Sequence, residues 1–206
     1  MHQVARDVDL AADTADERLA GELDRLGIRV LLGRQASDAG EPLRPVDLLA
    51  GLVASGEARL QTATIPLLLW RPDYASAAQA AAVRLPEQPR RMLQCFHTAA
   101  MLLSRRLRDR LEALRRPSAE LPDLFSIELG LADVGTPEQR LADLAARQAE
   151  LSGEALNWLG TYEHMATEQL RLAQIELLEG DVGAEVLPEA EAGGSLSETG
   201  LEVARR

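Results

Sequence analysis

Hydrophobic residues recur every three or four positions along most of the chain, which is the spacing of a helix with one buried face. Leucine and alanine dominate these positions and β-branched residues are sparse, a mixture that favours helices over strands. The pattern predicts an all-α protein, a compact bundle of about five to seven antiparallel helices. We expect one helical domain over residues 13–179, between a flexible N-terminus at 1–12 and a disordered acidic tail at 180–206.

The N-terminal helices are predicted within residues 13–116. We expect the first to begin at Thr14, because Thr14 and Glu17 have the spacing of a capping box. Gly27 is a typical residue for its end. Residues 28–32 fit either a last helical turn or a short strand, and the sequence leaves both open.

A second helix is expected to start at Pro45, a favourable first-turn residue, and further helices over residues 57–70 and 72–84. The segment Gly-Glu-Ala-Arg-Leu-Gln-Thr-Ala-Thr-Ile-Pro-Leu-Leu-Leu at 56–69 resembles the second half of a HEAT-type helical pair, which implies stacked antiparallel helices. No second copy follows at a period of about 40 to 47 residues. Pro66 lacks a backbone donor, so we expect it to kink its helix or mark the true start.

The longest helix is predicted over residues 87–116, where apolar residues form a continuous seam. Residues 92–103 are almost all apolar, so we expect burial on more than one side there. Beyond Ser104 the positions outside the seam are charged or small. The seam consists of Leu93, Phe96, Ala100, Leu103, Leu107, Leu111 and Leu114.

Basic charge is concentrated over residues 84–116, which hold nine arginines and three acidic residues in a chain of net charge −11. Two interpretations are open: a solvated helix face whose cations favour the C-terminal end of the helix dipole, or a docking surface for an acidic partner or a nucleic-acid backbone. The candidate partner-binding residues are Arg105, Arg106, Arg108, Arg110, Arg115 and Arg116.

The C-terminal part begins with a linker at residues 117–136 that is rich in proline and glycine. Its apolar residues, which include Leu121 and Phe125, predict that it packs against the bundle. Pro137 is expected to open the C-terminal helices, which extend over residues 137–179.

Several kinds of chemistry are excluded or disfavoured. All 22 basic residues are arginine, so Schiff-base catalysis and P-loop phosphate binding, which need lysine, are excluded. The single Cys95 forms no internal disulfide. Residues 1–20 lack the apolar stretch of a secretory signal, and the longest apolar run, residues 65–70, is too short to span a bilayer. We expect a cytoplasmic protein with no membrane partner.

The histidines do not form a recognisable metal or nucleophile site. Cys95 and His97 are two positions apart on a helix, which places their side chains about 200° apart around the axis. His164 and Glu168 share a helix face, but two ligands do not make a metal site. No metal or cofactor is expected.

One motif suggests an enzyme. Arg91-Met-Leu-Gln-Cys-Phe-His97 resembles the R-x4-6-H motif of HEPN ribonucleases, all-helical proteins whose arginine and histidine line a nuclease site at a dimer interface. The resemblance implies His97 as acid or base and Arg91 as phosphate clamp. In a continuous helix, however, these positions lie about 120° apart.

The sequence favours a non-catalytic interaction or regulatory subunit that docks a protein with an acidic surface through its arginine-rich helix face. The first alternative is a HEPN-type ribonuclease or toxin–antitoxin component. The second is a nucleic-acid-binding helical protein, which the lack of aromatic residues among the arginines and the net acidity disfavour. The sequence leaves homo-oligomerisation open.

Overall fold

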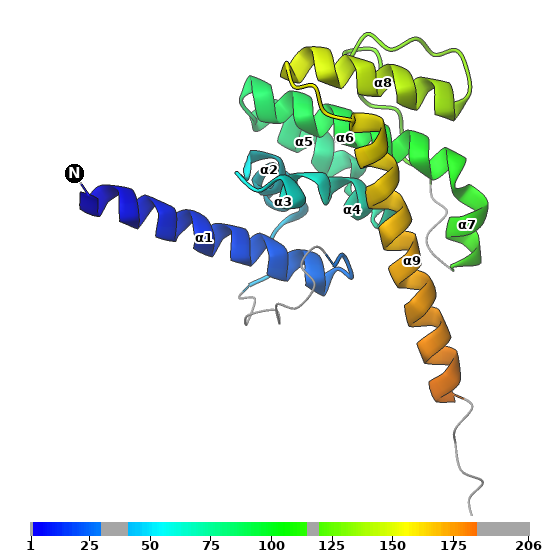
Figure 1. Cartoon of the computed structure of the whole chain (residues 1–206), viewed down its shortest axis with the longest axis horizontal. Coiled ribbons are helices and arrows are strands. Elements are labelled where there is room, and N and C mark those ends of the chain that lie inside the picture. Colours follow the sequence, from blue (N-terminus) through cyan, green and yellow to red (C-terminus); the bar gives the residue numbers. More distant parts are fainter. Residues whose placement is uncertain (1, 30–40, 115–119, 185–206) are drawn as a thin grey trace, which may run out of the picture.

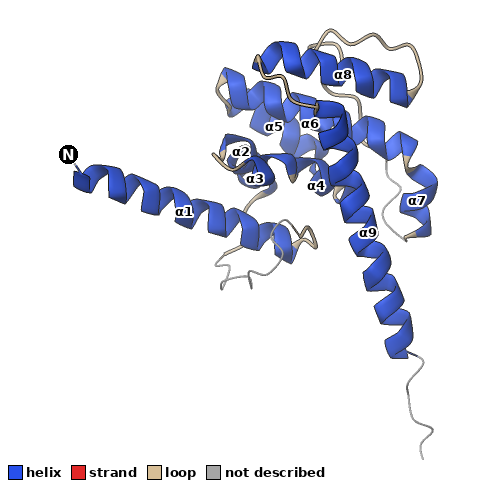
Figure 2. Cartoon of the chain, in the orientation of Figure 1, coloured by secondary structure: helices blue, strands red, loops and turns tan. Residues whose placement is uncertain are grey.

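The computed structural model describes residues 2–29, 41–114 and 120–184, and within these ranges all regular structure is helical (Figures 1 and 2). The prediction of an all-α protein is confirmed. The elements are α1 (His2–Arg25), α2 (Pro45–Ala54), α3 (Ala58–Thr62), α4 (Thr64–Trp70), the 3-10 helix η1 (Pro72–Tyr74), α5 (Ala75–Arg84), α6 (Glu87–Arg106), α7 (Arg108–Ala113), α8 (Pro137–Ser152) and α9 (Trp158–Ala184).

The core is centred on α4 and α6, which pack against each other. Every residue of α4 is buried, and so is every residue of α6 from 93 to 103, as expected for a helix covered on more than one side. Helices α2, α5, α8 and α9 surround α6 (Figure 1). Phe96 and Tyr162 are among the largest fully buried side chains, and burial of such a side chain stabilises the fold by about 1.5 to 3 kcal/mol.

Helix α1 begins at His2, so the predicted start at Thr14 is wrong. No proline or glycine interrupts residues 2–20, and good helix formers are frequent there, so the backbone continues through the capping-box spacing as helix. The flexibility expected for residues 1–12 stays a prediction. Figure 1 shows α1 extending away from the bundle toward its N-terminus.

At its other end α1 closes in a Schellman motif. Gly27 has a φ of 77°, and the amide of Ile28 donates to the carbonyl of Leu23 over 2.8 Å. Ile28 and Leu23 are both buried, which is the hydrophobic contact that accompanies this motif. Ile28 therefore lies outside the helix, and residues 30–32, where helix and strand were both open, lie outside the described residues.

The helix predicted over 57–70 is in fact two helices, α3 and α4, which meet at Ala63. Pro66 is the third residue of α4, where a helix does not use the backbone N–H. Pro66 thus lies in the first turn of a helix, close to the second alternative, although α4 starts two residues earlier, at Thr64. A HEAT unit distributes about 40 to 47 residues over two or three helices, so these helices of five and seven residues give that resemblance no support.

The helix predicted over 87–116 is also divided, because the backbone bends at Leu107 between α6 and α7. No proline or glycine causes this break. The seam residues beyond it, Leu107, Leu111 and Leu114, remain buried, so tertiary burial favours the bend. When α3 with α4 and α6 with α7 are each counted as one predicted helix, the described residues contain seven helical segments, at the top of the expected range.

The segment from 120 to 136 lies against the bundle without regular helix, with Leu121, Phe125 and Leu129 buried. Helix α8 then starts at Pro137 as expected, with Thr136 and Gln139 forming a capping box. Helix α9 continues to Ala184, so residues 180–184 of the predicted tail are helical. The rest of that tail, residues 185–206, lies outside the described residues.

Candidate partner-binding site

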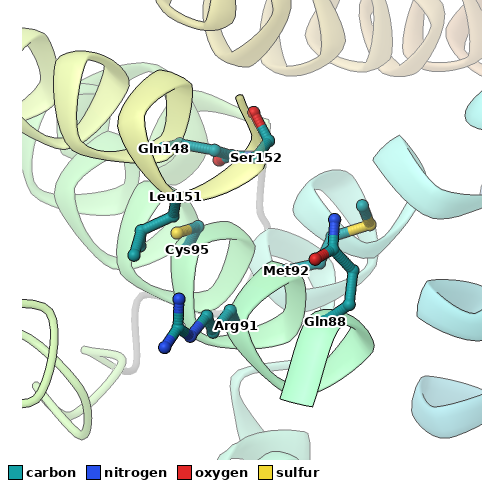
Figure 3. A pocket seen from close by; sticks show the side chains of 7 residues that line it. All are labelled: Gln88, Arg91, Met92, Cys95, Gln148, Leu151 and Ser152. Carbon is teal, nitrogen blue, oxygen red and sulfur yellow. The ribbon is translucent and has the colours of Figure 1, made fainter. Parts of the chain in front are cut away.

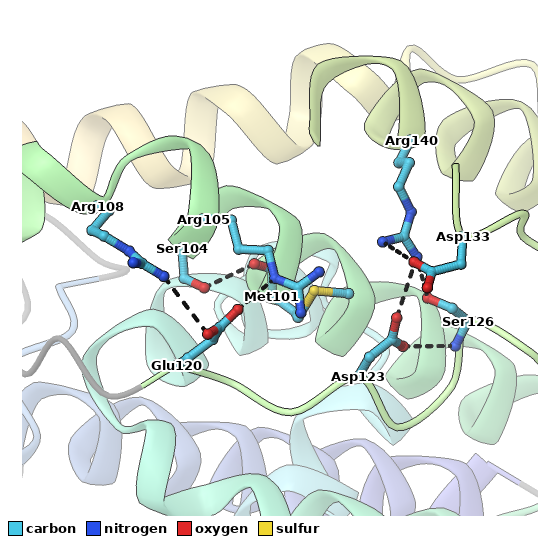
Figure 4. A network of polar contacts seen from close by, with 9 residues as sticks. All are labelled: Met101, Ser104, Arg105, Arg108, Glu120, Asp123, Ser126, Asp133 and Arg140. Atoms are coloured by element: carbon cyan, nitrogen blue, oxygen red, sulfur yellow. Dashed lines mark hydrogen bonds and ion pairs between the residues drawn. The ribbon is translucent and has the colours of Figure 1, made fainter. Parts of the chain in front are cut away.

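Four of the six predicted partner-binding arginines belong to the described part of the chain, whereas Arg115 and Arg116 lie outside it. Two of the four are occupied by one carboxylate of their own chain (Figure 4). The side chains of Arg105 and Arg108 approach Glu120, at 2.8 and 3.7 Å. Glu120 therefore neutralises part of the charge that the sequence assigned to an outward face.

Arg106 is used to hold two helices together. Its guanidinium forms an ion pair of 2.6 Å with Glu163 of α9, and its side chain is 22% exposed. The sequence placed Arg106 with the outward-facing arginines, but α9 crosses the end of α6 and lies beside it. This arginine is thus a structural tie rather than a free cation.

Arg110 is the exception among these arginines. It is exposed on α7 and forms no ion pair with any residue in the described ranges. It stands at the edge of a groove between α7 and α9. Arg110 is therefore a cation that the groove can offer to a partner.

The groove, which we call the α7/α9 groove, has a volume of about 540 Å³. Its lining is mainly apolar: Leu178 is 67% exposed and Ile175 is 39% exposed, while Leu170 forms a fully buried end. The full lining consists of Arg110, Ala113, Leu114, Leu170, Arg171, Gln174, Ile175, Leu177 and Leu178.

Local geometry explains how the groove forms. On α9, positions 170, 174, 177 and 178 follow the spacing of one helix face, which points at α7. Contacts with the body continue along α9: the side chain of Gln169 donates to the carbonyl of Gly27 over 2.9 Å, Ala173 is buried, and Glu176 pairs with Arg29 at 3.2 Å. From 174 to 178 every residue is at least partly exposed, so the groove opens along the helix.

The second arginine at the groove, Arg171, is exposed and already has a partner. Its guanidinium lies 3.1 Å from the carboxylate of Glu168 on the same helix. A surface pair of this kind is worth little and exchanges readily with another carboxylate. The groove thus combines an apolar floor with two cations: Arg110, which has no ion pair within the described ranges, and Arg171, which is paired with Glu168.

The structure does not bring the residues of the nuclease motif to one surface. His97 is fully buried, neither of its ring nitrogens has a hydrogen-bond partner within the described part of the chain, and its ring meets Phe125 edge-on at 5.2 Å. Burial lowers the pKa of His97 to about 4, so the imidazole is neutral at pH 7. Arg91 is partly exposed and pairs with Glu87. His97 thus has no access to a substrate in this conformation.

Cys95 is equally unsuited to catalysis. It borders a cavity of about 20 Å³, close to the size of one water molecule, together with Arg91, Gln148 and other residues of α6 and α8 (Figure 3). Burial raises the pKa of the Cys95 thiol to about 12, which keeps it protonated and unreactive.

The described residues contain neither a cluster suited to a metal ion nor a helix suited to a membrane. No group of three or more histidine, cysteine, aspartate or glutamate side chains within the described ranges is arranged to hold a metal ion. His164 is exposed, and its helix neighbour Glu168 is engaged by Arg171. In the same part of the chain, every helix is too short or too polar to traverse a lipid bilayer.

Sequence reasoning missed the apolar half of the groove. It predicted helix over these positions but assigned no role to Ile175 and Leu178. Their spacing was a usable signal. Apolar residues at 175, 177 and 178 make the apolar face of the helix wider than a single buried seam requires. The position of α7 opposite them depends on the bend at Leu107, for which the sequence contains no breaker.

Comparison with known proteins adds no assignment: no protein-family model matches the chain, and no curated protein or solved structure shows significant similarity to it. Function is therefore argued from the α7/α9 groove itself.

Proposed function

We propose that this protein is a non-catalytic interaction or regulatory subunit that docks an acidic, amphipathic segment of a partner protein in the α7/α9 groove. The observation that carries the proposal is the open apolar groove with Arg110 at its edge, free of ion pairs with other described residues. Under this proposal the arginine-dependent docking involves Arg110 at the groove rather than all six of the predicted arginines.

The apolar floor supports a helical or extended partner segment. Leu178 and Ile175 expose apolar surface that a partner would remove from water, at about 25 cal/mol for each Å² buried. A groove between two helices suits the apolar face of an amphipathic helix, which inserts side chains at successive turns. The described residues at the groove include no nucleophile or metal cluster, which supports binding rather than catalysis.

The charges at the groove support an acidic partner. Arg110 and Arg171 line it with positive charge, and complementary carboxylates would speed association and fix the orientation of the bound segment. Arg105 and Arg108 contribute less, because Glu120 already binds both. Cytoplasmic location stays a prediction, as do the ribonuclease and nucleic-acid-binding alternatives.

A capture experiment with matched variants tests the proposal. Purified wild type, Leu178→Glu and Ile127→Glu serve as baits in native lysate; Ile127 is 93% exposed but lies in the segment before α8, away from the groove. We expect wild type and Ile127→Glu to retain the same protein and Leu178→Glu to lose it. With that protein purified, calorimetry should show at least a tenfold weaker association for Leu178→Glu, about 1.4 kcal/mol.

The charge is tested separately. Arg110→Gln should weaken association with the purified partner and reduce its dependence on salt, because one screened attraction is removed. Equal capture by the Leu178→Glu and Ile127→Glu baits would contradict the proposal. RNA cleavage by wild type that is lost in His97→Ala would replace it with the ribonuclease alternative.

A further inference from the structure

The chain contains an acidic segment of its own beside the groove. Helix α9 ends at Ala184, six residues after Leu178, which corresponds to about 9 Å along the helix. Residues 185–206 therefore leave α9 close to the open end of the α7/α9 groove. These residues lie outside the described ranges, but their sequence and the distance from Ala184 to the groove are known.

The composition of residues 185–206 complements the groove. They contain five glutamates and two arginines, so their net charge is opposite to that of Arg110 and Arg171. Their last part carries three apolar residues that suit the groove floor: Leu196, Leu201 and Val203.

The segment is long enough to reach the groove. Twenty-two residues span up to about 70 Å when extended, whereas the return from Ala184 to Leu170 is about 21 Å along the helix. Pro188 and the pair Gly193-Gly194 favour a reversal of chain direction. Because the segment is tethered, its effective concentration at the groove is in the millimolar range, so even a weak contact is populated.

We propose that residues 185–206 occupy the α7/α9 groove of their own chain, with the apolar residues covering Ile175 and Leu178 and the glutamates beside Arg110 and Arg171. The inference rests on the proposed function and concerns regulation of that same site. An incoming acidic partner then has to displace the chain's own acidic segment, which sets a threshold of partner concentration for docking.

The isoleucines make this testable in the full chain. There are four, and only Ile175 lines the groove: Ile28 and Ile65 are buried elsewhere, and Ile127 is exposed in the segment before α8. Selective methyl labelling of isoleucine thus gives one reporter at the groove and one exposed control. We expect the joint variant Leu196→Ser, Leu201→Ser and Val203→Ser to shift the methyl signal of Ile175 and to leave Ile127 unchanged.

A matched control separates apolar docking from a general change in the tail. The joint variant Ala190→Ser, Ala192→Ser and Ala204→Ser alters three residues of the same segment and should leave all four signals in place. A synthetic peptide of residues 185–206, added to the full chain that carries the three apolar-to-serine changes, should move Ile175 back saturably. Arg110→Gln in that chain should weaken peptide binding two- to fivefold.

Two results would overturn the inference. In the first, the Ile175 methyl signal keeps its position both in the apolar-to-serine variant and on addition of the peptide. In the second, the signal shifts on tenfold dilution, which would show that a second copy of the chain occupies the groove. The tests are independent. If Ile175 ignores the tail while Leu178→Glu still abolishes partner capture, the proposed function stands without self-occupancy. If Ile175 responds to the tail but groove variants leave capture unchanged, the tail contact stands and the proposed function fails.

Discussion

Replacement of Arg140 by alanine is expected to lower the free energy of unfolding by about 3 kcal/mol. Arg140 lies in the first turn of α8, and its side chain is only 6% exposed. The guanidinium approaches Asp123 at 3.2 Å and Asp133 at 3.1 Å and donates to the hydroxyl of Ser126 over 3.1 Å (Figure 4). One buried cation thus fastens the segment before α8 at three points.

The cost arises mainly at Asp123. Burial acts to raise the pKa of this carboxyl, but hydrogen bonds from Ser126 and the ion pair with Arg140 outweigh it and hold the pKa below its ordinary value. Without the guanidinium, the Asp123 carboxylate, whose side chain is 28% exposed, loses its compensating charge, and the hydroxyl of buried Ser126 loses its donor. Together these losses cost more than the loss of a surface pair. Asp133 is 91% exposed and contributes little.

Urea unfolding at pH 7 provides the measurement, with Arg147→Ala as matched control. Arg147 lies on the same helix and donates to the carbonyl of Leu129 in the same segment, but it is 42% exposed, so its loss should cost about 1 kcal/mol. Arg140→Leu combined with Asp123→Asn should recover part of the stability, because the uncompensated charge is removed as well. Equal losses in the two alanine variants would show that the buried pair has no special role.

Helix positions could be predicted where the sequence contains both the period and the end signals. Pro45 and Pro137 mark the true starts of α2 and α8, and Gly27, with a φ of 77°, follows the end of α1 as expected. The start of α1 was misplaced for the opposite reason. Thr14 has the spacing of a capping box, but the residues before it are an uninterrupted run of helix formers, and the helix includes them.

Pro66 was a signal for the break at Ala63, but the break at Leu107 could not be predicted, because no residue there disfavours helix. Both serve burial: the chain bends so that Leu60 and Ile65, or Leu103 and Leu111, can all face the core. A periodic pattern indicates which face of a helix is apolar, but it does not indicate where the helix bends. Only the tertiary arrangement supplies this information.

The candidate site depended on just such information. Glu120, which neutralises Arg105 and Arg108, belongs to an irregular segment whose position no periodicity determines. Glu163 meets Arg106 only because α9 crosses the end of α6. Sequence analysis therefore identified the basic surface but not which of its charges remain available, and Arg110 emerges only from the pairing of the others.

A second large effect is expected on acidification. The pKa of His97 falls from its ordinary value of 6.5 to about 4 in the folded chain because burial disfavours the charged form; only the charge of Asp123 opposes this. Below pH 6.5 His97 becomes protonated in the unfolded chain but stays neutral in the folded chain. The free energy of unfolding therefore decreases as the pH falls to about 4. Each unit of pKa corresponds to about 1.4 kcal/mol, which gives a loss of about 3 kcal/mol across this range.

The variant His97→Leu should remove this loss. Neither ring nitrogen has a hydrogen-bond partner among the described residues, so leucine sacrifices no bond and should match or slightly exceed wild-type stability at pH 7. Near pH 4 the variant should be the more stable by about 3 kcal/mol, measured by urea unfolding. Titrating groups that do not interact with His97 act alike in both proteins and cancel in the difference.

His164→Gln is the matched control for this comparison. His164 is exposed on α9, so His164→Gln removes a solvent-facing imidazole and leaves the buried imidazole of His97 in place; the loss of stability caused by His97 should therefore persist in this variant. The contrary outcome is that His97→Leu loses as much stability on acidification as wild type and His164→Gln. His97 would then be protonated in the folded wild-type chain as well as in the unfolded chain. The edge of α6 that faces Phe125 would then open to water in acid, and the exclusion of His97 from substrates would hold only near neutral pH.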